Sequence, residues 1–112
     1  MVVIGFSDQP EGIWCVAGWV FRLLRGDVIT QYPEDKEMAD AFASAEIFSG
    51  LHVDSLTPEL AVRVADALRQ VTSGILSGAI RSGIRDLPFG DATAEEQYQQ
   101  ALRELLNILP PT

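Results

Sequence analysis

The sequence predicts an all-α fold, a compact bundle of four to five helices that forms one domain over residues 1–112. Residues that start and stop helices divide the chain into pieces of helical length, and three of these pieces repeat apolar residues at helical spacing. With 47% hydrophobic and 21% charged residues, the chain has the composition of a globular domain and is long enough to bury a core without disulfides.

The first piece carries signals for two different structures. Asp8 and Glu11 form an acidic capping pattern, the apolar run 13–24 follows, and Gly26 stands where a helix would end, so these residues favour a helix. The same run is rich in Trp, Val and Ile, which also suit a strand, and nearly every position is apolar, so periodicity does not decide. The alternative is an α+β fold in which this run and residues 2–6 form a short N-terminal hairpin.

The second piece begins after Pro33, where acidic residues concentrate in a first turn that the helix dipole favours. One apolar face follows at helical spacing: Met38, Ala41, Phe42, Ala45 and Phe48. Gly50 ends this helix, and residues 51–56 form a short connection.

Two further helices complete the prediction. Thr57 and Pro58 begin the third helix, and Thr93 with Glu96 forms a capping pair that begins the last one. Their apolar faces are Leu60, Val64, Leu68, Val71 and Ile75 in the third helix, and Tyr98, Leu102, Leu105, Leu106 and Leu109 in the last. The Ser-Gly run 73–83 either breaks the third helix or marks close contact with a neighbouring helix, which we favour at Gly74 and Gly78.

Few residues of the chain are suited to catalysis or metal binding. His52 is the single histidine, and Asp54 would orient it only on an extended backbone, so we interpret His52 as a surface residue. Cys15, the single cysteine, stands in an apolar run and is expected to be buried and inert. These two residues do not make a zinc site, and the acids 34–40 lack the spacing of a calcium-binding EF-hand loop. We therefore predict no catalytic residues, no metal, no cofactor and no enzymatic activity.

The charge of the chain is more informative than its motifs. The formal net charge is −8, which argues against direct binding to nucleic acid or to anionic membranes. Residues 33–59 hold seven acids against Lys36 alone, a net charge of −6. This concentration is either a solvated face that keeps the protein soluble or a docking surface for a basic protein partner. The absence of a secretory signal pattern, with a single cysteine, predicts a cytoplasmic protein.

These observations lead to the hypothesis of a non-catalytic acidic binding protein. Bacterial immunity proteins and antitoxins share this size and charge, and they neutralise a basic toxin or nuclease by covering its active or substrate-binding site. The expected partner-binding residues are Tyr32, Glu34, Asp35, Glu37, Asp40, Glu46, Ile47 and Asp54. The alternative is a structural or assembly module, in which the apolar faces of residues 38–48 and 98–109 complete a homodimer or a larger complex.

Overall fold

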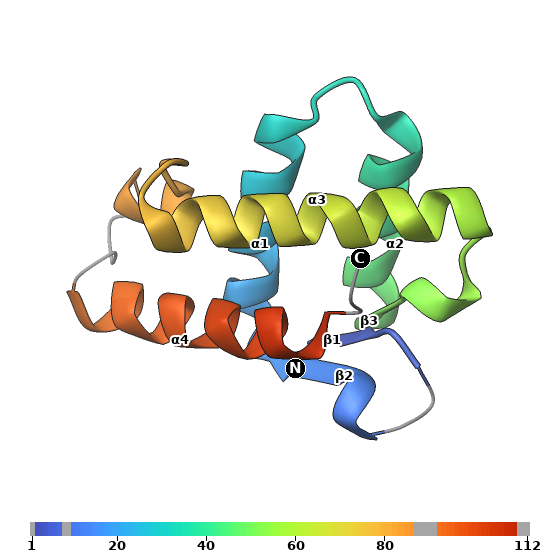
Figure 1. Cartoon of the computed structure of the whole chain (residues 1–112), viewed down its shortest axis with the longest axis horizontal. Helices are drawn as coiled ribbons and strands as arrows, with labels where there is room; N and C mark the ends of the chain where they lie inside the picture. Colours follow the sequence, from blue (N-terminus) through green and yellow to red (C-terminus); the bar gives the residue numbers. More distant parts are fainter. Residues whose placement is uncertain (1, 8–9, 87–91, 110–112) are drawn as a thin grey trace.

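Four α-helices and a three-stranded sheet make up the part of the chain that the computed structural model describes, residues 2–7, 10–86 and 92–109 (Figure 1). The predominance of helix agrees with the all-α prediction, and the sheet agrees with its α+β alternative. The two differ at the N-terminal run, where the chain forms strands before its first helix.

The N-terminal strands form an antiparallel hairpin. β1 (Val2–Gly5) pairs with β2 (Ile13–Val16), with Val2 opposite Val16, and the 3-10 turn η1 (Pro10–Gly12) precedes β2. The prediction of one helix from residue 13 is therefore wrong for its first four residues, and Asp8 lies outside the described residues. Trp14 and Val16 point into the core, while Ile13 and Cys15 point outward. The expectation of a buried Cys15 is wrong, because the strand alternates its side chains between two faces.

The first helix begins two residues after the hairpin. α1 (Gly18–Gln31) continues through Gly26, which was expected to end it, and closes where the N–H of Tyr32 donates to the carbonyls of Val28 and Ile29. Gly26 is exposed and no atom lies within 4 Å of the place its Cβ would take, so no neighbour forces the backbone to turn there.

The second helix confirms the prediction from its acidic start. Asp35 caps α2 (Lys36–Phe48), and its carboxylate accepts a hydrogen bond of 3.1 Å from the N–H of Met38. Met38, Phe42 and Ala45 are buried as predicted. Phe48 was placed on the same face, but it lies at the edge of that face in the last turn and is 79% exposed. Ser49 then closes the helix in the left-handed region, with φ of 58°.

The third strand follows the second helix directly. β3 (Gly50–His52) pairs parallel to β1, with Leu51 opposite Ile4, so the order of the sheet is β2-β1-β3. The 3-10 turn η2 (Val53–Ser55) leads from it to the third helix.

The Ser-Gly run does not break the third helix at Gly74. α3 (Pro58–Ser77) ends at Gly78, whose φ of 85° is the left-handed cap that glycine adopts without strain. A Cβ on Gly74 would overlap the side chain of Ile80, so the close contact there comes from the returning chain and not from another helix. The turn η3 (Gly83–Asp86) follows, and α4 (Ala92–Ile108) begins one residue before Thr93, so Thr93 lies within its first turn.

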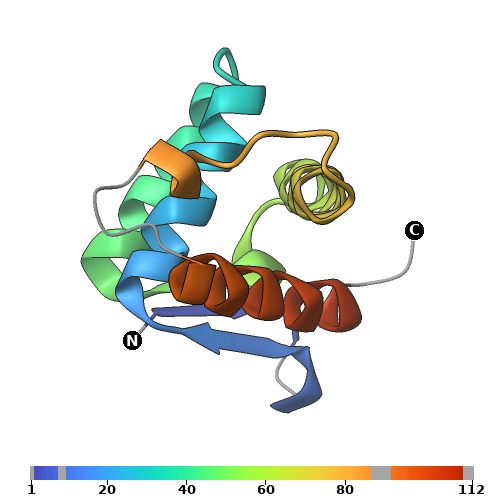
Figure 2. The ribbon, with the colours of Figure 1, turned by 90° about the vertical axis from the view of Figure 1, so that its left-hand side faces the viewer.

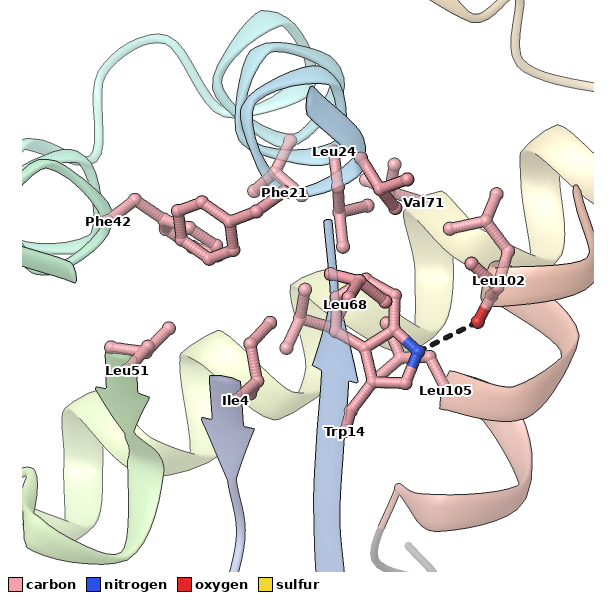
Figure 3. Packing of buried hydrophobic residues seen from close by; sticks show 14 of the residues in the cluster. Ile4, Trp14, Phe21, Leu24, Phe42, Leu51, Leu68, Val71, Leu102 and Leu105 are labelled. Atoms are coloured by element: carbon pink, nitrogen blue, oxygen red, sulfur yellow. Dashed lines mark hydrogen bonds between the residues drawn. The ribbon is translucent and has the colours of Figure 1, made fainter. Parts of the chain in front are cut away.

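One hydrophobic core joins all of these elements. α3 runs across α1 and α2 (Figure 1), and α4 packs against both α3 and β2 (Figure 2). Figure 3 shows Ile4, Trp14 and Leu51 from the three strands facing side chains of the helices. The indole Nε1 of Trp14 donates to the carbonyl of Ala101 at 2.9 Å, which fixes α4 to the hairpin. None of the described helices combines the length and apolar character that crossing a bilayer requires.

Candidate functional site

The residues predicted to bind a partner lie along α2 and beyond its two ends. Tyr32 and Glu34 stand in the turn before α2, Asp35 is its N-cap, Glu37, Asp40, Glu46 and Ile47 belong to the helix, and Asp54 lies in η2. The structure therefore places four of the eight residues on α2 and a fifth, Asp35, at its N-cap.

Five exposed residues of α2 form an outer stripe that begins on the side opposite the buried face and reaches the edge of that face at Phe48, while the sixth exposed residue, Lys36, stands one turn before Asp40. The α2 outer stripe consists of Glu37, Asp40, Ser44, Ile47 and Phe48. The spacing of three and four residues places these side chains on one face of a helix. Ile47 and Phe48 are 78% and 79% exposed. At about 1.5 Å per residue the stripe is about 16 Å long, with acids in its first half and large apolar side chains at its end.

Part of the negative charge is paired with an arginine of α3. A guanidinium nitrogen of Arg63 lies 3.2 Å from a carboxylate oxygen of Asp35 and 3.4 Å from one of Glu37. Desolvation acts to lower the pKa of Arg63, but the two carboxylates outweigh it and the pKa is raised. Because these three side chains remain in contact with solvent, the pairing contributes little to stability.

Glu46 is directed away from the α2 outer stripe. Its carboxylate forms an ion pair and a hydrogen bond with Arg25, and Arg22 lies 3.9 Å away, so Glu46 faces α1. The structure does not bring Glu46 together with Asp40 and Ile47.

The remaining acids carry charge that the chain itself does not neutralise. Within the described ranges, Glu34, Asp40 and Asp54 are exposed and form no ion pair. Tyr32 is 36% exposed beside Glu34. Three of the six predicted acids are therefore free to attract a cation from another molecule.

The residue pair considered for catalysis does not form a catalytic arrangement. His52 is exposed at the end of β3, and its ring lies over Gly5 and Gly50. The chain turns into η2 directly after it, so the extended backbone that would place Asp54 beside His52 ends there. In the part of the chain that the structure describes, no three His, Cys, Asp or Glu side chains gather as metal ligands.

A buried polar cluster centred on Asp27 was not predicted. Asp27 is only 6% exposed. One of its carboxylate oxygens accepts hydrogen bonds from the hydroxyls of Ser82 at 2.7 Å and Tyr98 at 2.8 Å, and the other accepts from the N–H of Gly83 at 2.8 Å. Burial, followed by the charge of Asp27, raises the pKa of Tyr98. The sequence carried a signal for this position, because Asp27 follows Leu24 by three residues and so lies on the buried face of α1.

A cavity of about 270 Å³ adjoins this cluster. Its lining is Ile75, Gly78, Ile80, Arg81, Ser82, Ile84, Glu95, Tyr98 and Gln99. Both hydroxyls in the lining donate their protons to Asp27, and the Ser82 oxygen also accepts the N–H of Ile84 at 3.2 Å. Through these hydrogen bonds the cluster joins α1, α4 and the segment around Ser82 and Gly83.

Comparison with known proteins adds no relative. No family model, curated protein sequence or solved structure matches this chain. The functional argument therefore depends on the chemistry of its own surface.

Proposed function

We propose that this protein is a non-catalytic acidic binding protein of the immunity or antitoxin kind, which neutralises a basic toxin or nuclease by covering its active or substrate-binding site. The observation that carries the proposal is the exposed acidic side of α2 and of the turn before it, where Glu34 and Asp40 have no ion pair among the described residues.

Unpaired surface carboxylates attract cations over several ångströms of solvent. Proteins that hold nucleic acid are basic where they bind phosphate, so such a site is complementary to an acidic helix. Long-range attraction of this kind raises association rates by about 10 to 1,000-fold at low ionic strength. The net charge of −8 adds to this attraction.

Two side chains of the predicted set supply apolar contact. Tyr32 stands beside Glu34, and Ile47 lies at the far end of the α2 outer stripe from Glu37. Interfaces derive most of their binding free energy from a few large side chains surrounded by weaker polar contacts, so a mixed surface of this kind suits a protein partner better than a small ion.

Most side chains of the two apolar faces that the sequence suggested for a homodimer are buried within the chain. Met38, Phe42 and Ala45 from the one face, and Tyr98 and Leu102 from the other, are buried within this chain. These side chains are not accessible to a second copy, whereas Phe48 of the first face is 79% exposed, so the structural or assembly module stays the second candidate.

The proposal is tested with a double charge reversal, Glu34→Lys with Asp40→Lys, and a partner recovered from the native host by salt elution from the immobilised protein. We avoid Asp35, because it caps α2, and Glu37, because it pairs with Arg63. We expect the association rate at low salt to fall by about tenfold or more, and the difference to shrink as salt screens the charges.

The matched control makes the same charge change on α4, with Glu96→Lys and Glu104→Lys, two exposed acids outside the α2 outer stripe. We expect its association rate to change by no more than about threefold, since only the net charge differs. Binding that responds neither to salt nor to the Glu34 and Asp40 reversal contradicts the proposal.

A further inference from the structure

We infer that Ile47 and Phe48 form an apolar anchor that enters a socket on a basic partner of different sequence, and that a second copy of this chain is not the occupant. The inference rests on the proposed function and names the chemistry of its partner: a folded protein with lysine or arginine side chains beside an apolar pocket.

The exposure of the anchor is not required by the fold. Met38, Phe42 and Ala45 already supply the face that α2 buries, while Ile47 and Phe48 are 78% and 79% exposed at the end of the same helix. Two adjacent large apolar side chains on the surface of an acidic protein are a common mark of an interaction site.

The anchor is held in a fixed position on both sides. Phe48 is the last residue of α2, and the N–H of Ser49 closes the helix on the carbonyl of Ala45. The carbonyl of Ser49 accepts the N–H of Val3 at 3.2 Å, and β3 begins at Gly50. Because helix and sheet fix the backbone here, little conformational freedom is lost when the side chains are buried by a partner.

The charge pattern disfavours a second copy whose α2 outer stripe lies along the first. A two-fold dimer uses the same patch on both chains. If two α2 outer stripes met in parallel, Glu37 and Asp40 would face their own equivalents. If they met antiparallel along their full length, these carboxylates would lie against Ile47 and Phe48 and lose water without gaining a cation.

A second copy brings few basic side chains to offset this charge. Lys36 at the start of α2 and Arg103 on α4 are exposed and form no ion pair among the described residues, but each chain carries a net charge of −8, so two copies repel one another. All four arginines of α1 and α3 already form ion pairs with acids of their own chain: Arg22, Arg25, Arg63 and Arg69. A partner of different sequence that carries cationic groups beside an apolar pocket complements both the acidic half and the apolar half of the stripe. Asp40 and Ile47 are seven residues apart, so its cationic group and its socket stand about 10 Å from one another.

The experiment compares Phe48→Ser with Val62→Ser, a matched apolar side chain that is 61% exposed on α3. The partner is the basic protein that salt releases from the immobilised chain. We expect Phe48→Ser to raise the Kd by about tenfold or more through faster dissociation, with the salt dependence of association unchanged. We expect Val62→Ser to change the Kd by less than about twofold. A photo-crosslinking phenylalanine analogue at position 48 should join the chain to that same protein.

The outcomes separate this inference from the proposed function. If Phe48→Ser binds as the wild type does while the Glu34 and Asp40 reversal slows association, the anchor is wrong and the acidic docking surface stands. Cross-linking of position 48 to a second copy, or a mass that doubles with concentration and returns to monomer in Phe48→Ser, overturns the inference. Recovery of no basic protein overturns both.

Discussion

At Asp27 a carboxylate is packed among hydrocarbon side chains, and three hydrogen bonds offset the cost of taking it out of water. The donors are Tyr98 of α4, Ser82 just before η3 and Gly83 at the start of η3, so the hydrogen bonds of one α1 residue hold three parts of the chain together. The pattern follows the general behaviour of buried charges, which persist where their partners are complete.

Replacing Asp27 with Asn should destabilise the protein without unfolding it. The amide keeps the shape of the side chain but loses its charge and points a donor toward groups that already donate. We expect the free energy of unfolding to fall by about 2–4 kcal/mol, measured by urea denaturation. Asp66→Asn, on the exposed side of α3, is the control and should cost less than about 1 kcal/mol. Equal losses in the two variants would show that Asp27 does not act through its hydrogen bonds.

The raised pKa of Tyr98 predicts a loss of stability in alkaline solution. The folded protein holds the phenol proton more tightly than the unfolded chain, whose ordinary pKa is 10.0. The contribution of this proton is therefore complete below pH 10.0 and is lost progressively as the pH rises above that value. Tyr98→Phe has no proton to lose. Its unfolding free energy should fall less between about pH 8 and pH 11 than that of the wild type, and parallel curves would contradict this reading.

Among the elements, the two left-handed helix ends differ in how well their residues suit the backbone. α2 ends at Ser49, with φ of 58°, and α3 ends at Gly78, with φ of 85°. A side chain in this region crowds the neighbouring carbonyl, whereas glycine adopts it freely.

Exchanging the residues at these two ends should move stability in opposite directions. We expect Ser49→Gly to raise the free energy of unfolding by up to about 1 kcal/mol, and Gly78→Ala to lower it by about 1 kcal/mol. No atom lies within 4 Å of a Cβ added at Gly78, so the loss there reflects the backbone alone. Thermal denaturation followed by circular dichroism measures both changes. An increase in stability of the Gly78→Ala variant would contradict a left-handed backbone at residue 78.

Sequence signals predicted the helices better than the strands. α2, α3 and α4 have polar starts and one apolar face each, so periodicity located them within a few residues. β2 was missed because its outward residues, Ile13 and Cys15, are apolar by type, which hides the alternation of a strand. Phe48 was predicted to be buried because it continues the apolar spacing of α2. Spacing alone does not show that α2 ends at this residue, where the side chain remains exposed.

For the molecule as a whole, the location of the excess charge was predictable and its pairing was not. The concentration of acids between residues 33 and 59 is visible in the sequence. That Arg63 meets Asp35 from 28 residues away, and Arg25 meets Glu46 from 21, depends on how α3 and α1 pack beside α2. The Asp27 cluster joins residues 55 and 71 positions apart, and no local pattern specifies such a meeting.

Because a single cluster of buried side chains includes every strand and helix, the described parts should unfold together. In a Trp19→Phe variant, tryptophan fluorescence reports on Trp14 alone, which is buried between the hairpin and α4, and far-ultraviolet circular dichroism reports on the helices. We expect the two urea transitions to coincide, as they do for small two-state domains. An earlier fluorescence transition would mean that the hairpin detaches before the helices melt.

The position of β1 in the middle of the sheet sets an order of events on the ribosome. Translation delivers this strand first, yet its parallel neighbour β3 is made only after α1 and α2. Trp14 finds its carbonyl acceptor on Ala101, 87 residues later. Until α4 has left the exit tunnel, the indole of Trp14 is uncovered and the core of the nascent chain is incomplete. During this interval the exposed apolar side chains are most prone to aggregation and to binding by chaperones.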